Sequence, residues 1–177
     1  MVINLLEKNT MKMMLALLLL GLSSIAMETQ AQVKSKSFNF TLKMLLARNV
    51  PEITIADAAK NINNYLFLDA REQKEYNVSH LPNTRFVGYN NFTLSSLTGI
   101  AKDKPLVIYC SIGKRSENIT RKLKKAGYTN IHNLYGGIFE WINAGNTVYD
   151  LQNKPTDKVH AYGKFWSQFL DKGTKVY

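Results

Sequence analysis

The stretch from Leu106 to Ala126 constrains the fold of this chain more than any other. Leu106 to Tyr109 is a short apolar run that includes β-branched residues, which predicts a buried strand. A polar loop with one glycine follows. Ile119 and Leu123 then recur at helical spacing among charged residues, so we expect a helix to begin near Arg115. A buried strand that passes through a short loop into a helix is typical of a parallel α/β sheet.

Cys110 is the only cysteine among the 177 residues, and it stands at the carboxyl end of this predicted strand. Open α/β sheets bind ligands at that edge. Backbone N–H groups that converge at a helix start favour an anion, and a thiolate is an anion. Lys114 and Arg115 add positive charge, which should raise the thiolate fraction near neutrality. A lone buried cysteine is often only a small hydrophobic residue, but this setting favours a nucleophile.

The loop resembles the active-site loop of the rhodanese-like sulfurtransferases, whose pattern is Cys-x-x-Gly-x-Arg followed by Ser or Thr. Cys110, Gly113, Arg115 and Ser116 match this pattern. The resemblance implies that the cysteine carries a persulfide, which the backbone amides of the loop surround. It also implies that the loop binds the substrate anion, and the residues concerned are Ser111, Ile112, Gly113, Lys114, Arg115 and Ser116.

Three further elements resemble the same family and occur in the family's order. They are Asp69-Ala70-Arg71 at the end of a predicted buried strand, His80-Leu81-Pro82, and Gly136-Gly137 with Trp141. Each element is short, but the four together are fairly specific. The two glycines should allow a tight turn with close approach of backbones, and Trp141 is expected in the core.

Asp69, Arg71 and His80 are expected to support the active-site loop. Asp69 can accept hydrogen bonds from loop amides or pair with a cation, and Arg71 can pair with Glu72 or Glu75. A purely structural role for both is the alternative, because structural ion pairs outnumber catalytic ones. For His80, we expect packing and hydrogen bonding rather than general-base catalysis.

The turn around His80 departs from the family pattern, Gly-His-Ile-Pro-Gly-Ala. Ser79 and Asn83 replace the two glycines, and Thr84 replaces the alanine. Because asparagine tolerates a positive φ, we still expect a turn at this point.

Strands alternate with helices along the chain, so the expected fold is α/β: a rhodanese-like open parallel sheet with helices on both faces. The resemblance covers residues 51–150, which we expect to form the rhodanese-like domain. Residues 32–50 should form a leader and a helix. That helix is expected from Phe40 to Arg48, with Phe40, Met44 and Leu45 on one face.

Residues 151–177 form an aromatic tail that we expect to pack on the domain. Its spacing predicts one face of a short helix, made of Tyr162, Phe165, Trp166 and Phe169. A stripe that binds a partner is the alternative, although such stripes usually belong to a core.

Residues 1–31 have the pattern of a signal peptide. Lys8 and Lys12 precede an apolar run from Met13 to Leu22, and small residues near Ala31 suit cleavage after it. This predicts a bacterial protein that is periplasmic or secreted, with a mature form that is not embedded in a membrane. A retained N-terminal membrane anchor is the alternative.

The net charge of +10 favours anionic partners. No nucleic-acid-binding signature accompanies this charge, so we expect no nucleic-acid partner. One cysteine excludes an intramolecular disulfide and a multi-cysteine metal site. No metal or organic cofactor is implied.

The expected function is that of an exported single-domain sulfurtransferase. Cys110 would take sulfur from a small anionic donor of the thiosulfate type and pass it to a thiol, to cyanide or to a partner protein. A non-catalytic persulfide carrier or binding module is one alternative. A phosphatase or arsenate reductase is another, but related loops of that kind are one residue longer than the four residues between Cys110 and Arg115.

Overall fold

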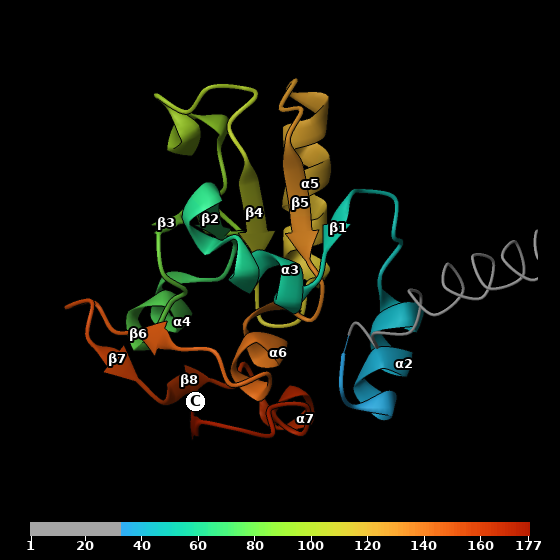
Figure 1. The fold of residues 1–177 in the computed structure, drawn as a ribbon, viewed down its shortest axis with the longest axis vertical. Helices are drawn as coiled ribbons and strands as arrows, with labels where there is room; N and C mark the ends of the chain where they lie inside the picture. The colour runs from blue at the N-terminus through green and yellow to red at the C-terminus, as the bar shows by residue number, and fades with distance from the viewer. Residues whose placement is uncertain (1–32) are drawn as a thin grey trace, which may run out of the picture. The chain divides into compact units, whose positions relative to one another are not determined.

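A computed structural model describes residues 33–177, and a five-stranded parallel sheet forms their centre (Figure 1). The strand order is β1-β5-β4-β2-β3. The strands are β1 (Glu52–Ile53), β2 (Leu66–Asp69), β3 (Thr84–Phe86), β4 (Leu106–Tyr109) and β5 (Ile131–Leu134). The expected open parallel sheet is therefore confirmed.

Short helices connect the strands and flank the sheet. The α-helices are α2 (Lys36–Leu45), α3 (Ile55–Lys60), α4 (Gln73–Val78), α5 (Lys114–Lys125), α6 (Gly137–Asn143) and α7 (Lys164–Ser167). Two 3₁₀ helices are η1 (Ile62–Asn64) and η2 (Leu94–Leu97). Among residues 33–177, no helix is long and apolar enough to cross a membrane. The predicted signal peptide lies outside the described residues.

Strand β4 lies in the middle of the sheet, between β5 and β2, and all four of its residues are buried. Neighbouring side chains on a strand point to opposite faces. Val107 and Tyr109 accordingly join one apolar cluster, whereas Leu106 and Ile108 join the other. A strand that is buried on both faces needs apolar residues throughout, and this explains the continuous run that the sequence shows.

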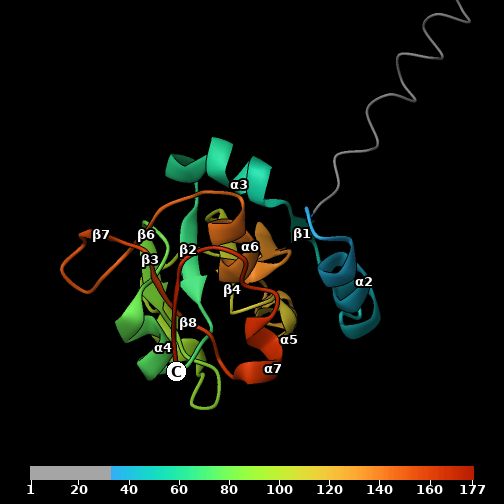
Figure 2. The same cartoon turned by 90° about the horizontal axis from the view of Figure 1, so that it is seen from below.

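Helices cover both faces of the sheet (Figures 1 and 2). On one face the core includes Ile55 of α3 and Phe139 of α6, together with residues of α2 and of the C-terminal segment, residues 148–177. On the other face it includes Ile119 and Leu123 of α5 and Leu97 of η2. Helix α5 returns the chain from β4 to β5, as parallel neighbouring strands require.

Helix α2 begins earlier than the sequence analysis predicted, and it buries a different face. Ser35 caps it by accepting a hydrogen bond from the Phe38 N–H (3.3 Å). Phe38 and Leu42 are buried, whereas Phe40 is 68% and Met44 75% exposed. The predicted face was therefore wrong. The physical reason is that Phe38 stacks on Phe169 of the C-terminal segment, with ring centroids 4.9 Å apart.

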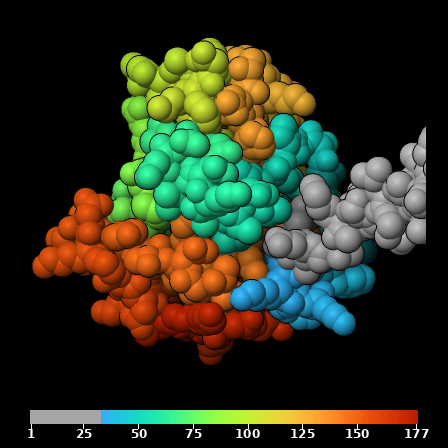
Figure 3. All heavy atoms as spheres, viewed as in Figure 1, coloured from blue at the N-terminus to red at the C-terminus, as the bar shows by residue number. Residues whose placement is uncertain are grey.

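The C-terminal segment forms more structure than the predicted short helix. It contains α7 and two small sheets, one of β6 (Val148–Tyr149) with β7 (Pro155–Thr156) and one of β8 (Lys158–His160) with β9 (Thr174–Val176). Its aromatic residues do not share one buried face, because Phe169 is buried but Tyr162 and Phe165 are at least half exposed. In Figure 3 the surface of this segment, orange to red, lies beside that of α2, in blue.

Candidate functional site

The loop of interest runs from the end of β4 to the start of α5. Cys110 follows β4 directly, and its side chain is buried, with 1% of the residue exposed. Gly113 takes a φ of 109° and turns the chain into α5. The N–H of Gly113 points back at the cysteine and donates a hydrogen bond to Cys110 Sγ (3.1 Å). An N–H donor directed at a sulfur atom favours an anionic sulfur.

Helix α6 holds the loop from the opposite side. The N–H of Ile138 donates to the Cys110 carbonyl (2.9 Å), and the N–H of Phe139 donates to the Ser111 carbonyl (3.1 Å). The first N–H groups of a helix have no partner within the helix itself. The loop carbonyls satisfy these donors, so the Gly136-Gly137 turn and the cysteine loop form one unit.

We expect Gly137→Ala to disturb this unit strongly. A Cβ atom on Gly137 would overlap the Cys110 carbonyl oxygen and lie 2.7 Å from the Ser111 carbonyl oxygen. Gly127→Ala is a matched control, because Gly127 also has a positive φ (+86°) but has nothing within 4 Å of its added Cβ. Urea unfolding should show that Gly137→Ala costs about 2 kcal/mol more than Gly127→Ala. Equal costs would mean that the close approach is unimportant.

Asn133 holds the other end of the loop. Its side-chain N–H group donates to the Gly113 carbonyl (3.1 Å), and its side-chain oxygen accepts from Ser116 Oγ (2.7 Å). The Ser116 hydroxyl therefore faces β5 rather than the sulfur. Asn133 was not predicted as a site residue, because its position on a strand gives no local sign of contact with the loop.

Arg115 is held by a carboxylate from another helix. Its two terminal nitrogens donate to the two oxygens of Glu75 in α4, each at 2.7 Å. Arg115 also donates to Ser111 Oγ (2.9 Å), and that hydroxyl donates to Glu75 (3.0 Å). A bidentate pair of this kind fixes geometry as well as charge. Arg115 thus ties α4 to the loop, and its charge is balanced within the protein.

The same pair predicts how stability depends on pH. Burial alone would raise the pKa of Glu75, but the hydrogen bonds and charge of Arg115 outweigh burial and lower this pKa from 4.5 to about 2. A carboxyl group whose pKa is lower in the folded state than in the unfolded state stabilises the fold at pH values above its unfolded-state pKa. This contribution is lost as the pH falls through the folded-state pKa. We expect Glu75 to contribute about 3 kcal/mol at neutral pH. The loss should occur between pH 4.5 and about 2.

Urea unfolding across this pH window measures the effect. The free energy of unfolding should fall less steeply with decreasing pH in Glu75→Gln than in the wild type. Asp103→Asn removes an exposed carboxylate and should leave the slope unchanged. Parallel curves for Glu75→Gln and the wild type would contradict the assignment.

Lys114 is also engaged within the protein. Its Nζ donates to the Leu45 carbonyl of α2 (2.9 Å) and to Glu117 (3.4 Å). Both cations that the sequence analysis expected to hold the substrate anion therefore have intramolecular partners. Their local effect is to fix α2 and the loop in place.

Arg71 has a different partner from the one predicted. It pairs with Asp69 rather than with Glu72 or Glu75, at 2.6 Å between Nη2 and Oδ2, and both side chains are fully buried. Arg71 also donates to the Ser79 carbonyl (2.6 Å). Glu75 already pairs with Arg115, and Asp69 is close enough to accept hydrogen bonds from Arg71 through both of its carboxylate oxygens. The pair lies next to the loop because the N–H of Ala70 donates to the Tyr109 carbonyl (2.8 Å).

His80 lies in the turn that follows α4. Its two ring nitrogens are 2.9 Å from the Leu81 carbonyl and 3.1 Å from the Asp150 carbonyl. Its ring stacks on Tyr76, with centroids 4.8 Å apart. The expected turn is present, with Asn83 at a φ of 50°. These contacts suit the packing role that we expected for His80.

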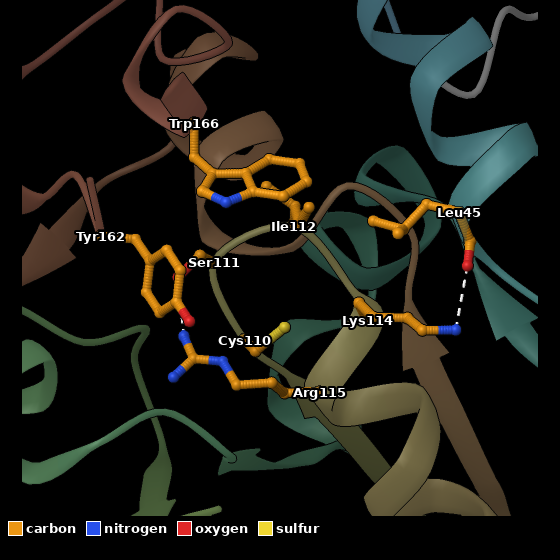
Figure 4. Close-up of a pocket in the computed structure, with 8 residues that line it drawn as sticks. All are labelled: Leu45, Cys110, Ser111, Ile112, Lys114, Arg115, Tyr162 and Trp166. Carbon is orange, nitrogen blue, oxygen red and sulfur yellow. Dashed lines mark hydrogen bonds between the residues drawn. The ribbon is translucent and has the colours of Figure 1, made fainter. Parts of the chain in front are cut away.

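The Cys110 loop lines a cavity of about 140 Å³ (Figure 4). The residues around it are Leu45, Cys110, Ser111, Ile112, Lys114, Arg115, Tyr162 and Trp166. Three of them were not predicted as site residues: Leu45 of α2, and Tyr162 and Trp166 of the C-terminal segment. The sequence showed the aromatic cluster of the tail, but nothing in its spacing connected that cluster with Cys110.

The site is centred on one buried cysteine. Within residues 33–177, no group of three or more His, Cys, Asp or Glu side chains could hold a metal ion. A buried cysteine at the end of a central parallel strand, with a backbone N–H directed at its sulfur, defines a class: an α/β domain with a cysteine at the edge of the parallel sheet where such sheets bind ligands.

Comparison with known proteins identifies the family. The model of the rhodanese-like domain matches residues 54–144, so the chain belongs to the rhodanese-like family. A thiosulfate:glutathione sulfurtransferase from Saccharomyces cerevisiae is 31% identical over 104 residues, which cover 52% of this chain and 75% of that protein. A tRNA uridine(34) hydroxylase from Onion yellows phytoplasma is 35% identical over 81 residues. That match spans 43% of this chain and only 26% of the hydroxylase.

A solved structure agrees with the fold. The crystal structure of a thiosulfate sulfurtransferase from Pseudomonas aeruginosa matches with a TM-score of 0.55 and 19% identity. The match covers 73% of this chain and 25% of that one. At this level of identity the likeness concerns the fold alone.

Proposed function

We propose that this protein is a sulfurtransferase that carries sulfur as a persulfide on Cys110. The observation that carries the proposal is the hydrogen bond from the Gly113 N–H to the buried Cys110 sulfur. The loop around that sulfur is short and rigid, because α6, Asn133 and Glu75 each hold part of it. Family membership and the name of the yeast relative support the same chemistry.

The reaction proceeds in two steps. The Cys110 thiolate attacks the outer sulfur of a donor of the thiosulfate type, and a bond forms between the two sulfur atoms. The sulfur–sulfur bond of the donor breaks, and its electron pair leaves with sulfite. A thiolate or cyanide then attacks the outer sulfur of the persulfide, which regenerates the Cys110 thiolate. The preorganised Gly113 N–H donor stabilises the anionic sulfur both in the free thiolate and in the persulfide. A covalent intermediate of this kind predicts ping-pong kinetics.

The test is the intact mass of the protein before and after thiosulfate. Sulfur transfer should add about 32 Da, and the gain should disappear on treatment with cyanide. Because the chain has one cysteine, protein treated first with iodoacetamide is a direct control and should gain nothing. No gain from thiosulfate or from a persulfide donor would refute the proposed function.

A turnover assay with cyanide separates an enzyme from a carrier. The carrier alternative draws support from aromatic surface near the site, because Tyr162 is 50% and Phe165 is 64% exposed. An enzyme should form thiocyanate from thiosulfate and cyanide over many turnovers. A carrier should load slowly from thiosulfate but accept sulfur from a persulfide-bearing partner protein.

We further propose that the protein acts outside the bacterial cytoplasm after removal of residues 1–31. The support is the sequence pattern alone: basic residues, an apolar run and small residues before the cleavage point. Expression of the full chain in a bacterium, followed by cell fractionation and N-terminal sequencing, tests this. A mature N-terminus at Gln32 in the periplasm or medium supports it, and a full-length cytoplasmic product would contradict it.

A further inference from the structure

The wall of the cavity opposite the loop is apolar and aromatic. Figure 4 shows the Cys110 sulfur facing the space below Trp166, with Tyr162 on one side and Leu45 on the other. Ile112 of the loop completes this wall. A cavity of about 150 Å³ with apolar walls is large enough to accept benzene, and the cavity here is about 140 Å³.

The cations of the cavity offer little to a doubly charged ligand. Arg115 is bound through both terminal nitrogens to Glu75, so the pair carries no net charge. Lys114 donates to the Leu45 carbonyl and to Glu117. Moving a dianion such as thiosulfate out of water requires compensating donors. A monoanion needs fewer of them, and the Gly113 N–H already points at the reacting sulfur.

Most of the apolar wall comes from residues outside the matched family domain. Leu45, Tyr162 and Trp166 all lie outside residues 54–144, which the family model matches. These residues are held in place by the surrounding structure. Trp166 packs on Phe169 with centroids 6.3 Å apart, and Phe169 in turn stacks on Phe38 of α2.

The position of the Tyr162 side chain depends on an unusual backbone conformation. Its φ is 62°, a conformation that non-glycine residues rarely adopt. The Tyr162 N–H donates to His160 Nδ1 (3.0 Å), and the ring lies over the Arg115 guanidinium at 4.8 Å. A residue held in this conformation near a reactive group indicates that its position matters for function.

We propose that the sulfur donor is an organic monoanion whose apolar group packs against Trp166, Ile112 and Leu45, such as an organic thiosulfonate or persulfide. This inference rests on the proposed sulfurtransferase function. With a thiosulfonate, the Cys110 thiolate attacks the outer sulfur, the donor's sulfur–sulfur bond breaks, and the electron pair leaves with the sulfinate. With a persulfide, the leaving group is the organic thiolate. Charge and electrons balance in both cases, and no further oxidant or reductant is needed.

The test compares three donors that share the same reacting sulfur: benzenethiosulfonate, methanethiosulfonate and thiosulfate. The rate of persulfide formation on the full chain is measured by intact mass, relative to the rate of each donor with N-acetylcysteine. The expected order is benzenethiosulfonate, then methanethiosulfonate, then thiosulfate. Dividing by the rate with N-acetylcysteine removes differences in the intrinsic reactivity of the donors. The first two donors have the same charge, so the difference between their normalised rates measures the contribution of the apolar group.

The Trp166→Ala variant tests whether the aromatic wall causes the preference for a donor with an apolar group. The rate with benzenethiosulfonate should fall about 10-fold, as expected for the loss of one aromatic contact. The rate with thiosulfate should change little. Phe40→Ala is the control, because Phe40 is an exposed aromatic residue of α2 that does not line the cavity. It should leave both rates unchanged.

The outcomes separate this inference from the function on which it rests. If all three donors load sulfur with equal normalised rates, or if Trp166→Ala lowers every rate equally, the preference for an organic donor is wrong and the sulfurtransferase function stands. If no donor loads sulfur, both proposals are wrong.

Discussion

Cys110→Ser should abolish the mass gain from thiosulfate and reduce thiocyanate formation by at least about 10³-fold. A serine oxygen cannot form a persulfide, and its hydroxyl remains protonated near neutral pH. No other cysteine in the chain can replace the lost nucleophile. The hydrogen bond from the Gly113 N–H can still reach a serine oxygen, so the loop should keep its shape. Mass spectrometry and a thiocyanate assay measure the two effects.

The fold of the variant provides the necessary control. Cys110 is buried, and replacing it with serine should change the free energy of unfolding by no more than about 1–2 kcal/mol. Cys110→Ala keeps the site apolar and serves as a second variant. A folded Cys110→Ser protein that keeps more than a tenth of the turnover would show that sulfur transfer does not pass through this residue.

Asp69→Ala should destabilise the domain by about 3–5 kcal/mol, because it leaves the Arg71 guanidinium buried without a counter-ion. Burial alone would lower the pKa of Arg71, but the charge and hydrogen bonds of Asp69 outweigh burial and raise it. Arg71 therefore stays charged in the folded state. Its fully buried side chain has no access to water that could replace Asp69.

A double variant distinguishes the loss of a partner from the loss of packing. Asp69→Leu with Arg71→Met removes both charges, and replacing a whole buried pair with apolar residues is often close to neutral. Urea unfolding should therefore show a smaller loss for the double variant than for Asp69→Ala. A cost below about 1 kcal/mol for Asp69→Ala would mean that the pair contributes little to stability.

The local features of the chain were largely predictable. The buried strand from Leu106 to Tyr109, the helix after the loop and the parallel sheet follow from periodicity and from the order of strands and helices. Asn83 takes the positive φ expected of its turn. These features depend on residues close together in the chain, where spacing and side-chain shape already limit the backbone.

The choice of ion-pair partners was less predictable. Arg71 has three acidic residues within reach along the chain, and Glu72 and Glu75 were the partners expected for it. The structure pairs it with Asp69, because Glu75 points from α4 to Arg115 across a separation of 40 residues. Which carboxylate meets which cation depends on how α4 and α5 are placed beside the loop, and spacing does not carry that information.

The sequence by itself therefore determined the fold class, the family resemblance and the cysteine around which the site is built. Only the tertiary structure decided what surrounds that cysteine. Leu45 and Trp166 are far from Cys110 in the chain, and they reach its cavity because Phe38 of α2 stacks on Phe169 of the C-terminal segment. The physical reason is that apolar packing is not directional. An aromatic stripe shows that a segment will be buried against something, and the shapes of the packed elements decide against what.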